Sequence, residues 1–395
     1  MNVVYALETF PSRNVTSSIF LAGPTPRSPE VASWRPKALK ILADMGYDGV
    51  VFVPEPSDGV WHKDYEGQVT WEDAALHRAD VILFWIPRDM VTMPALTTND
   101  EWGFWKSSGK VVLGVPPESV STKYQKFHAK ENDVPVWDTL EDTVRAAVAR
   151  TEELVIGARR LPKRLGGENA IPLHIWSTPT FQRWFSNQSV AGNRIQDARV
   201  EYTLWNKRTP FLWVLWVDMW IASEGRNKDI EVLASRPDIC TAVLHGPVHR
   251  GDLGGTRVLL VREYRSPANN PTGMVLELPG GSSKNPEDDD LTIIQHEVSE
   301  ETGVDAPASL FQPIGIRQVM STLSLHRANC YSLELTDKAL DEIVRTSSTP
   351  RGVAEDTERT YTEVTTLEKI LRSNTMDWSM IGMVLTAVLK DGDVL

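Results

Sequence analysis

Short apolar segments alternate with helix-type segments over the first 155 residues, and this alternation constrains the fold more than any other feature of the sequence. Residues 79–87 form a continuous apolar run directly after residues 71–78, which have helical spacing. Such a strand is buried on both faces, as in the parallel sheets of α/β proteins. We therefore predict a doubly wound, parallel α/β sheet of the flavodoxin or Rossmann type within residues 1–155. Further strands are expected at 17–23, 49–53, 110–116 and 134–137, and further helices at 34–45, 99–107 and 140–154.

The predicted sheet brings several loops to one edge. In open parallel sheets, ligands bind beyond the carboxyl ends of the strands. That edge would hold Gly23 and Pro24, the turn after Pro87, and the start of a helix capped by Asn99 or a neighbouring Thr. Gly23, Pro24 and Asn99 are therefore candidate substrate-binding residues. No Gly-x-Gly-x-x-Gly fingerprint occurs in this region, so dinucleotide binding is poorly supported.

The candidate polar groups of this region are carboxylates, Asp80 at a strand start and Glu101 early in a helix. A carboxylate near a helix N-terminus is favoured by the helix dipole, so Glu101 has a simple structural explanation. The functional alternative is a nucleophile that attacks the anomeric carbon of a sugar while a second carboxylate handles the leaving base. Spacing alone leaves both explanations open.

Four short segments carry a family resemblance: Phe-Leu-Ala-Gly-Pro at 20–24, Trp-Glu at 71–72, Ala-Asp-Val-Ile-Leu-Phe-Trp-Ile-Pro at 79–87 and Thr-Thr-Asn-Asp-Glu-Trp-Gly at 97–103. Together they resemble the nucleoside 2-deoxyribosyltransferase-like family. The resemblance implies that Glu101 is the nucleophile and that Asp80 contacts the nucleobase. Well-known members carry a further Asp six residues before the nucleophile, where this chain has Ala95. Hydrolysis of an N-glycosidic bond and binding without catalysis therefore remain alternatives to transfer.

A second candidate site lies in residues 277–304, which have the pattern of a strand, a glycine turn, an acidic loop and a helix ended by Gly303. On that helix Glu297, Glu300 and Glu301 lie three and four residues apart and share one face. Three such carboxylates repel one another unless a cation lies between them, and oxygen ligands suit Mg²⁺ or Mn²⁺ bound to a phosphate. The alternative is a solvated acidic face.

Around this helix the sequence resembles the Nudix hydrolase box, Gly-x5-Glu-x7-Arg-Glu-U-x-Glu-Glu-x-Gly-U, where U is apolar. The loop is one residue longer, so either Glu287 or Asp288 stands for the first Glu, and His296 replaces the Arg. The resemblance implies an α/β/α fold on a mixed sheet, a divalent metal held by the three glutamates of the helix, and Glu300 as a catalytic residue. The matching positions are Gly281, Glu297, Val298, Glu300, Glu301, Gly303 and Val304.

The residues before the box indicate which branch of the Nudix family the sequence resembles. Arg262 and Arg265 end an expected strand, and Glu277-Leu-Pro-Gly-Gly281 follows, as in the ADP-ribose pyrophosphatase branch of Nudix enzymes. This implies an Arg that holds a phosphate or ribose, Gly281 at the substrate, and Glu277 as an accessory metal ligand or ribose contact. A surface pair with Glu263 is the alternative for either Arg. In this branch a Glu of a later loop helps to activate water, and the candidates are Glu355 and Glu358.

Length and composition bound the remaining possibilities. A chain of 395 residues is too long for one core, and we expect a connector at 156–194 and a second domain at 195–395. The net charge of -12 argues against broad nucleic-acid binding, and two cysteines are too few for a disulfide framework. The longest apolar run, 211–222, is too short to span a membrane and fits either a helix or a strand.

These observations predict a cytoplasmic, homo-oligomeric enzyme that acts on a small nucleotide or nucleoside, with no nucleic acid or membrane as partner. The Nudix half would use Mg²⁺ or Mn²⁺ to hydrolyse the pyrophosphate of ADP-ribose-like or other nucleoside diphosphate derivatives. The N-terminal half would bind a nucleoside or nucleotide and cleave its N-glycosidic bond. Two alternatives remain: the N-terminal half is a non-catalytic nucleotide sensor that regulates the Nudix half, or the Nudix half is degenerate and only binds.

Overall fold

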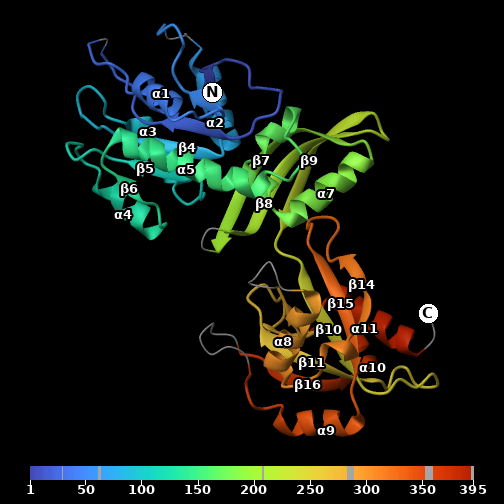
Figure 1. Ribbon diagram of the computed structural model, residues 1–395. Coiled ribbons are helices and arrows are strands. Elements are labelled where there is room, and N and C mark those ends of the chain that lie inside the picture. Colours follow the sequence, from blue (N-terminus) through green and yellow to red (C-terminus); the bar gives the residue numbers. More distant parts are fainter. Residues whose placement is uncertain (29, 61–63, 207–208, 283–288, 352–358, 393–395) are drawn as a thin grey trace. The chain divides into compact units, whose positions relative to one another are not determined.

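The computed structural model describes residues 1–395 apart from residues 29, 61–63, 207–208, 283–288, 352–358 and 393–395. The chain divides into two compact units, Met1–Ser235 and Arg236–Leu395 (Figure 1). The sequence predicted boundaries near residues 155 and 195. Residues 156–235 instead pack with the first unit, through buried contacts that composition does not reveal.

A six-stranded parallel sheet forms the centre of the first unit, as the strand and helix alternation predicted. The order β3-β2-β4-β5-β6 is that of flavodoxin-like sheets, and its direction reverses between β2 and β4. β1 adds an edge strand, beside β3, that the sequence analysis did not predict. The strands are β1 (Asn2–Tyr5), β2 (Ser18–Ala22), β3 (Val50–Val53), β4 (Val81–Trp85), β5 (Val111–Gly114) and β6 (Val136–Trp137).

Helices cover both faces of this sheet (Figure 1). Successive strand residues point to opposite faces, so Ile82 and Phe84 of β4 join the core under α2 and α3, whereas Val81 and Leu83 join the core under α1 and α5. Burial of each such side chain contributes about 1.5–3 kcal/mol to stability. A polar replacement in either core would therefore destabilise this unit. The helices are α1 (Arg35–Asp44), α2 (Tyr65–Arg78), α3 (Leu96–Trp105), α4 (Lys123–Glu131) and α5 (Leu140–Ala158).

Two helices begin earlier than the sequence pattern predicted. α2 starts at Tyr65 because the side chain of Asp64 accepts the N–H of Gly67 at 2.9 Å. α3 starts at Leu96, after Ala95, whose backbone is left-handed with φ of 58°. The prediction that Asn99 or a neighbouring Thr caps this helix is wrong, because these residues lie inside the first turn and no side chain caps the N-terminus.

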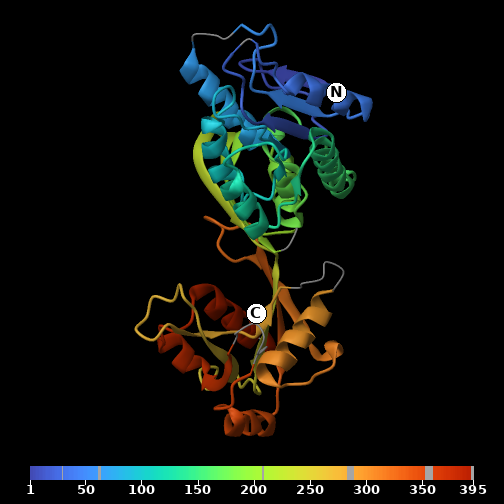
Figure 2. The same ribbon diagram turned by 90° about the vertical axis from the view of Figure 1, so that its left-hand side faces the viewer.

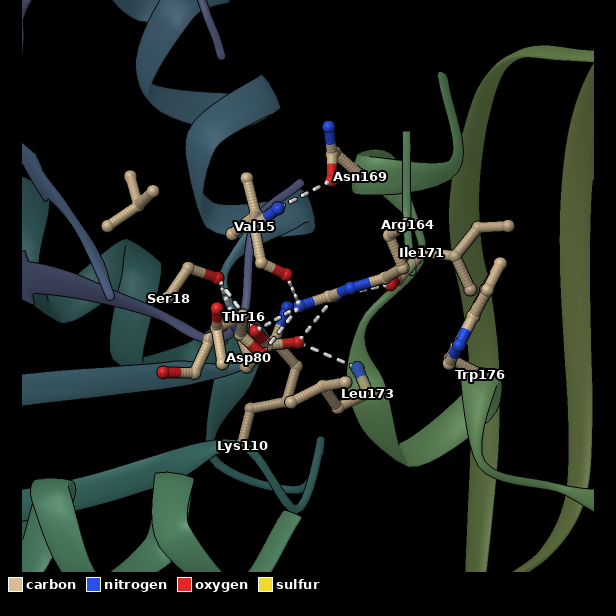
Figure 3. A network of polar contacts seen from close by, with 12 residues as sticks. Val15, Thr16, Ser18, Asp80, Lys110, Arg164, Asn169, Ile171, Leu173 and Trp176 are labelled. Carbon is tan, nitrogen blue, oxygen red and sulfur yellow. Dashed lines mark hydrogen bonds and ion pairs between the residues drawn. The ribbon is translucent and has the colours of Figure 1, made fainter. Parts of the chain in front are cut away.

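The expected connector is part of the first unit. It contains the short helices η1 (Gly166–Ala170) and α6 (Leu173–Trp176) and the longer α7 (Pro179–Val190). Arg164 is buried, and its guanidinium forms two hydrogen bonds with the Asp80 carboxylate, at 2.9 and 3.0 Å (Figure 3). A basic, glycine-containing segment has the composition of a linker, but here its Arg pairs with a residue that lies 84 positions earlier in the chain.

An antiparallel sheet of β7 (Arg194–Asn206), β8 (Thr209–Ile221) and β9 (Arg226–Ser235) completes the first unit. The apolar run at 211–222 is therefore a strand. Trp213 and Leu215 are buried, and the Trp213 ring lies 6.2 Å from that of Phe181 on α7. The two-residue period is hidden in the sequence because outward positions such as Val214 and Trp216 are also apolar. Within the described parts of the chain, no helix combines the length and apolar composition needed to cross a membrane.

The second unit is built on a mixed sheet of order β12-β11-β10-β15-β14, in which β13 pairs with β10, and β16 with β11. Val243 and Val258 face the core under α10 and α11, and Ala242 and Leu259 face the core under α8 and α9. Figure 2 shows α8 and the α10–α11 pair on opposite sides of the sheet. Unrelated families share such layers, so the arrangement does not establish the Nudix fold. The elements are β10 (Ile239–His245), β11 (Arg257–Tyr264), β12 (Met274–Glu277), β13 (Gly280–Gly281), α8 (Asp290–Thr302), η2 (Ala308–Leu310), β14 (Gln312–Gln318), β15 (Arg327–Glu334), α9 (Asp337–Thr346), β16 (Tyr361–Thr366), α10 (Leu367–Arg372) and α11 (Trp378–Asp391).

Candidate functional site

The carboxyl edge of the parallel sheet, where its strands end, carries a polar cluster at the point where the strand order reverses. Gly23 follows β2 with φ of 149°, and a Cβ there would lie 2.2 Å from the carbonyl oxygen of Trp85. Only glycine lets the loop after β2 pass this close to the end of β4. The carbonyl of the next residue, Pro24, accepts the indole N–H of Trp34 at 3.1 Å. Gly23 and Pro24 therefore lie at the predicted edge.

Arg35, at the start of α1, ties the loops of this edge together. Its buried guanidinium group donates to the carbonyls of Leu21 and Gly23, at 3.1 and 2.7 Å, and to the carboxylate of Glu55 at 2.5 Å. Glu55 follows β3, so one side chain connects the ends of two neighbouring strands. A buried ion pair with this many hydrogen bonds fixes geometry more than it adds net stability.

Two further carboxyl groups, Glu101 of α3 and Glu72 of α2, belong to the same cluster. Burial, followed by the negative charge of Glu72, raises the pKa of Glu101 to about 8, while Arg35 opposes the shift. Burial also raises the pKa of Glu72. Gln68 positions Glu72 by donating to its carboxylate at 2.7 Å and to the carbonyl of Pro54 at 3.2 Å. The cluster can thus hold a proton and a negative charge side by side near neutral pH, as an acid and a nucleophile require.

Asp80 does not join this cluster, which contradicts its predicted contact with a nucleobase. It precedes β4, and because the strands are parallel it lies at the opposite, amino edge of the sheet. Its buried carboxylate accepts hydrogen bonds from Arg164, from Ser18 Oγ at 3.0 Å and from the N–H of Leu173 at 2.7 Å (Figure 3). Donors from the protein itself therefore hydrogen-bond to both oxygens of this carboxylate, and the role of Asp80 is structural.

Asn99 lies at the predicted edge but not beside Glu101. Its Oδ1 accepts hydrogen bonds from Arg88 Nη2 at 2.5 Å and from Gln125 Nε2 at 2.7 Å. Residues two apart on a helix point about 200° away from each other, so Asn99 and Glu101 occupy different flanks of α3.

The sequence analysis did not single out Arg35, Glu55 or Gln68, and it quoted Glu72 only as part of a resemblance. One signal could have found Glu72. It lies four residues after Gln68 on a helix, so the two polar side chains share a face. Arg35 offered no comparable signal, because an Arg in the first turn of a helix is usually a surface residue.

In the second unit, α8 ends at the glycine that the sequence predicted. Gly303 is left-handed with φ of 72°. Glu301 accepts the N–H of Gly280 at 3.0 Å, and a Cβ at Gly281 would lie 2.5 Å from Glu297 Oε1. Two of the three glutamates therefore face the Gly280–Gly281 turn.

The arginines before this turn pair with acids, and one of these pairs is the contact with Glu263 that the sequence left open as an alternative. Arg265 lies 2.7 Å from Glu277 and 2.9 Å from Glu263. Arg262 lies 3.5 Å from Glu363 rather than beside Glu263. Glu277, expected as an accessory metal ligand or ribose contact, is thus bound to a guanidinium.

The predicted metal site of the second unit stays a prediction. Glu300 lies 3.4 Å from His296 Nδ1, the residue that replaces the Arg of the box. Among the described residues, no group of three or more His, Cys, Asp or Glu side chains is arranged to hold a metal ion. The further candidates Glu287, Asp288, Glu355 and Glu358 lie outside the described residues.

Two hollows open on the first unit. The larger, about 460 Å³, lies between residues of α1 and α5 and includes none of the cluster. The smaller, about 270 Å³, lies beyond the ends of β1 and β3, at the carboxyl edge. Neither is lined by Glu101 or Glu72, and we place the candidate site on the polar cluster because of its coupled carboxyl groups and its position at the carboxyl edge. The smaller hollow is lined by Ala6, Leu7, Glu8, Pro56, Ser57 and Asp58.

Comparison with known proteins bears on this unit. Residues 16–119 match the family model described as Nucleoside 2-deoxyribosyltransferase like. This part of the first unit is therefore similar to that family. The match covers roughly a quarter of the chain and includes Arg35, Glu72 and Glu101. It supports a role in nucleoside or nucleotide metabolism and suggests an enzyme. No curated protein matches the chain, and the matched residues do not reach the second unit, so the Nudix resemblance stays a prediction.

Proposed function

We propose that the deoxyribosyltransferase-like domain cleaves the N-glycosidic bond of a nucleoside or nucleotide, with Glu101 as nucleophile and Glu72 as acid. One observation carries the proposal. The two carboxyl groups interact electrostatically in a cluster at the carboxyl edge of a doubly wound sheet, within the residues that match the family model. Ligands bind at that edge, where the strand order reverses.

The chemistry follows from these two groups. The ionised Glu101 attacks the anomeric carbon, and the bond to the base nitrogen breaks with its electron pair on the base. Glu72, which burial keeps protonated to higher pH, gives its proton to that nitrogen. Water or a second base then attacks the glycosyl ester, its proton passes to Glu72, and the ester electrons return to Glu101. Two displacements retain the configuration of the sugar.

The proton must lie on Glu72 and the negative charge on Glu101 for this reaction to start. Because the pKa of Glu101 is about 8, its ionised fraction increases as the pH rises towards that value. Loss of the proton from Glu72 opposes the reaction, so only the fraction with the proton on Glu72 and the charge on Glu101 is active. We therefore expect a bell-shaped pH dependence of kcat/KM, which is a property of the coupled pair.

Base release tests the proposal. Wild type would be incubated with a panel of nucleosides and nucleotides, and the free base measured by chromatography. Glu101→Gln should lower the rate on the order of 10³-fold or more, whereas Asp100→Asn, at the exposed neighbouring residue, should keep most of it. A sugar adduct on Glu101, seen by mass spectrometry after an acid quench, would support the covalent step. If wild type binds nucleotides but releases no base, the domain is a nucleotide sensor and the proposal fails.

We propose a second function, hydrolysis of an ADP-ribose-like or other nucleoside diphosphate derivative by the Nudix-like second unit. The observation that favours it is the contact between α8 and the glycine turn, with Glu301 bonded to Gly280 and Glu297 against Gly281. This activity would depend on Mg²⁺ or Mn²⁺, bound by the glutamates of α8 after a rearrangement of their side chains.

Metal titration and product analysis test this second function. Glu300→Gln should lower phosphate ester release from dinucleotides and sugar nucleotides, and it should weaken Mn²⁺ binding measured by calorimetry. Glu342→Gln, an exposed change on α9, is the matched control. No hydrolysis of any of these compounds by wild type with either metal would show that the unit is degenerate and at most binds.

We further propose that the protein is a cytoplasmic homo-oligomer with no nucleic-acid or membrane partner. The net charge of -12 disfavours broad nucleic-acid binding, and the two free, buried cysteines suit a reducing compartment. Light scattering of the purified chain would measure its oligomeric state, and a monomer at micromolar concentration would contradict that part.

A further inference from the structure

Arg88 carries a buried positive charge that has no carboxylate partner among the described residues. It lies just after β4 at the carboxyl edge and is 6% exposed. Its guanidinium group donates to the carbonyl of Ser121 at 2.7 Å and to Oδ1 of Asn99 at 2.5 Å, and both acceptors are neutral. Within the part of the chain that the structure describes, its Nε has no hydrogen-bond partner. Burial alone lowers the pKa of Arg88, with no contribution from a neighbouring charge.

Two other buried arginines of this unit show how unusual this is. Arg35 pairs with Glu55, and Arg164 pairs with Asp80. A buried cation without a counter-ion is unfavourable, and the arrival of an anion would offset that cost. The positive charge of Arg88, which lacks a counter-ion among the described residues, therefore indicates an anionic ligand.

The guanidinium of Arg88 lies against the first turn of α3, through its hydrogen bond to Asn99. This helix has ten residues, and its N-cap residue, Ala95, has no side-chain oxygen to accept the first N–H groups. Uncapped N–H groups at a helix N-terminus attract anions, because they need acceptors and carry the positive end of the helix dipole. Leu96 and Thr97 are exposed on this turn, so a ligand can reach it.

We propose that Arg88 and the first turn of α3 bind the phosphate of a nucleoside 5′-monophosphate, which is the preferred substrate of the domain. A guanidinium fork and helix N–H groups together suit a phosphate monoester. Leu96 and Glu101 are five residues apart, about 7.5 Å along the helix, which resembles the span from a 5′-phosphate to the anomeric carbon. The identity of the substrate rests on the proposed glycosidic function, whereas phosphate binding does not.

Thermal unfolding with inorganic phosphate as the probe tests the site directly. The whole chain carrying Glu101→Gln would be used, because this variant cannot turn over substrate. Phosphate should raise its Tm saturably, while chloride at the same ionic strength should not. Adding Arg88→Gln should weaken the apparent affinity at least tenfold. Arg145→Gln, an exposed arginine paired with Glu141, should leave the affinity unchanged.

A second variant keeps the test valid if Arg88→Gln does not fold. Asn99→Asp places a carboxylate where Arg88 now finds a neutral oxygen, and it preserves the shape of the side chain. The new charge would neutralise Arg88 and interact favourably with the helix N-terminus. We expect a higher Tm without phosphate and loss of the response to phosphate. If Asn99→Asp and its parent respond equally to phosphate, the proposed site is wrong.

Base release then tests the substrate class. In wild type, kcat/KM for a nucleoside 5′-monophosphate should exceed that for the matching nucleoside at least tenfold, and Asn99→Asp should remove this preference. Phosphate binding without base release from any compound would contradict the proposed glycosidic function but support the phosphate site. Equal rates for both substrates, with no Tm response to phosphate, would overturn the inference.

Discussion

At the scale of single residues, Glu101 holds a proton more tightly in the folded protein than in the unfolded chain. Burial raises the pKa of its carboxyl group from 4.5 to about 8. Between these two pH values the unfolded chain has released the proton and the folded protein still keeps it. Unfolding therefore releases a proton in this window, and the free energy of unfolding falls as the pH rises through it. Below about 4.5 both states are protonated, and above about 8 both are ionised.

The substitution Glu101→Gln removes this penalty while keeping the shape of the side chain. We expect the variant to be about 2 kcal/mol more stable than wild type near pH 9, after allowance for solvent screening of a partly exposed group. Near pH 4 the two proteins should differ by less than about 0.5 kcal/mol. Urea unfolding at both pH values would measure the difference, with Glu131→Gln on α4 as the exposed control. A stability difference that does not change with pH would contradict the raised pKa.

At the scale of elements, the end of α8 depends on one glycine. A Cβ at Gly303 would be strained in the left-handed region and would lie 2.1 Å from Arg351 Nη1. Gly303→Ala should therefore cost about 1 kcal/mol or more. Gly382 is the matched control, because it lies inside α11 with open space around it, and Gly382→Ala should stabilise by about 0.5–1 kcal/mol. Urea unfolding followed by circular dichroism would compare them, and equal effects of the two changes would refute this account of the helix end.

The elements that the sequence predicted well are those whose signals are local. The central strand β4 is apolar throughout because both of its faces are covered, and α8 carries its own terminating glycine. The start of α2 was missed because it depends on a cap at Asp64 that lies outside the apolar period. Strand β8 stayed ambiguous because both of its faces hold apolar residues.

For the candidate site, the sequence could predict only which edge of the sheet a residue lies at, because that follows from the strand topology. Gly23 and Pro24 were placed correctly because they follow a parallel strand. Asp80 was misplaced although its position before β4 was enough to assign it to the opposite edge. Arg35 could not have been found, since its hydrogen bonds to the carbonyls of Leu21 in β2 and Gly23 after it exist only once the strands have assembled.

At the scale of the whole molecule, the extent of the first unit follows from contacts between distant residues. The Asp80 carboxylate at the amino edge of the parallel sheet needs Arg164 and the N–H of Leu173, both from the segment expected to be a linker. A domain ended near residue 155 would leave a buried carboxylate without these partners. Breaking one side of a buried ion pair costs about 3–5 kcal/mol, which is a large share of the stability of a domain.

We therefore expect a fragment of residues 1–235 to unfold cooperatively in urea and a fragment of residues 1–155 to be unfolded or only partly structured. Arg164→Met in the longer fragment isolates the cause, because it keeps the chain length and removes only the charge and its hydrogen bonds. This variant should lower the free energy of unfolding by about 3 kcal/mol or more. If the short fragment unfolded with the same midpoint as the long one, the segment after residue 155 would be dispensable. The boundary first expected from composition would then describe the folding unit better than the contacts do.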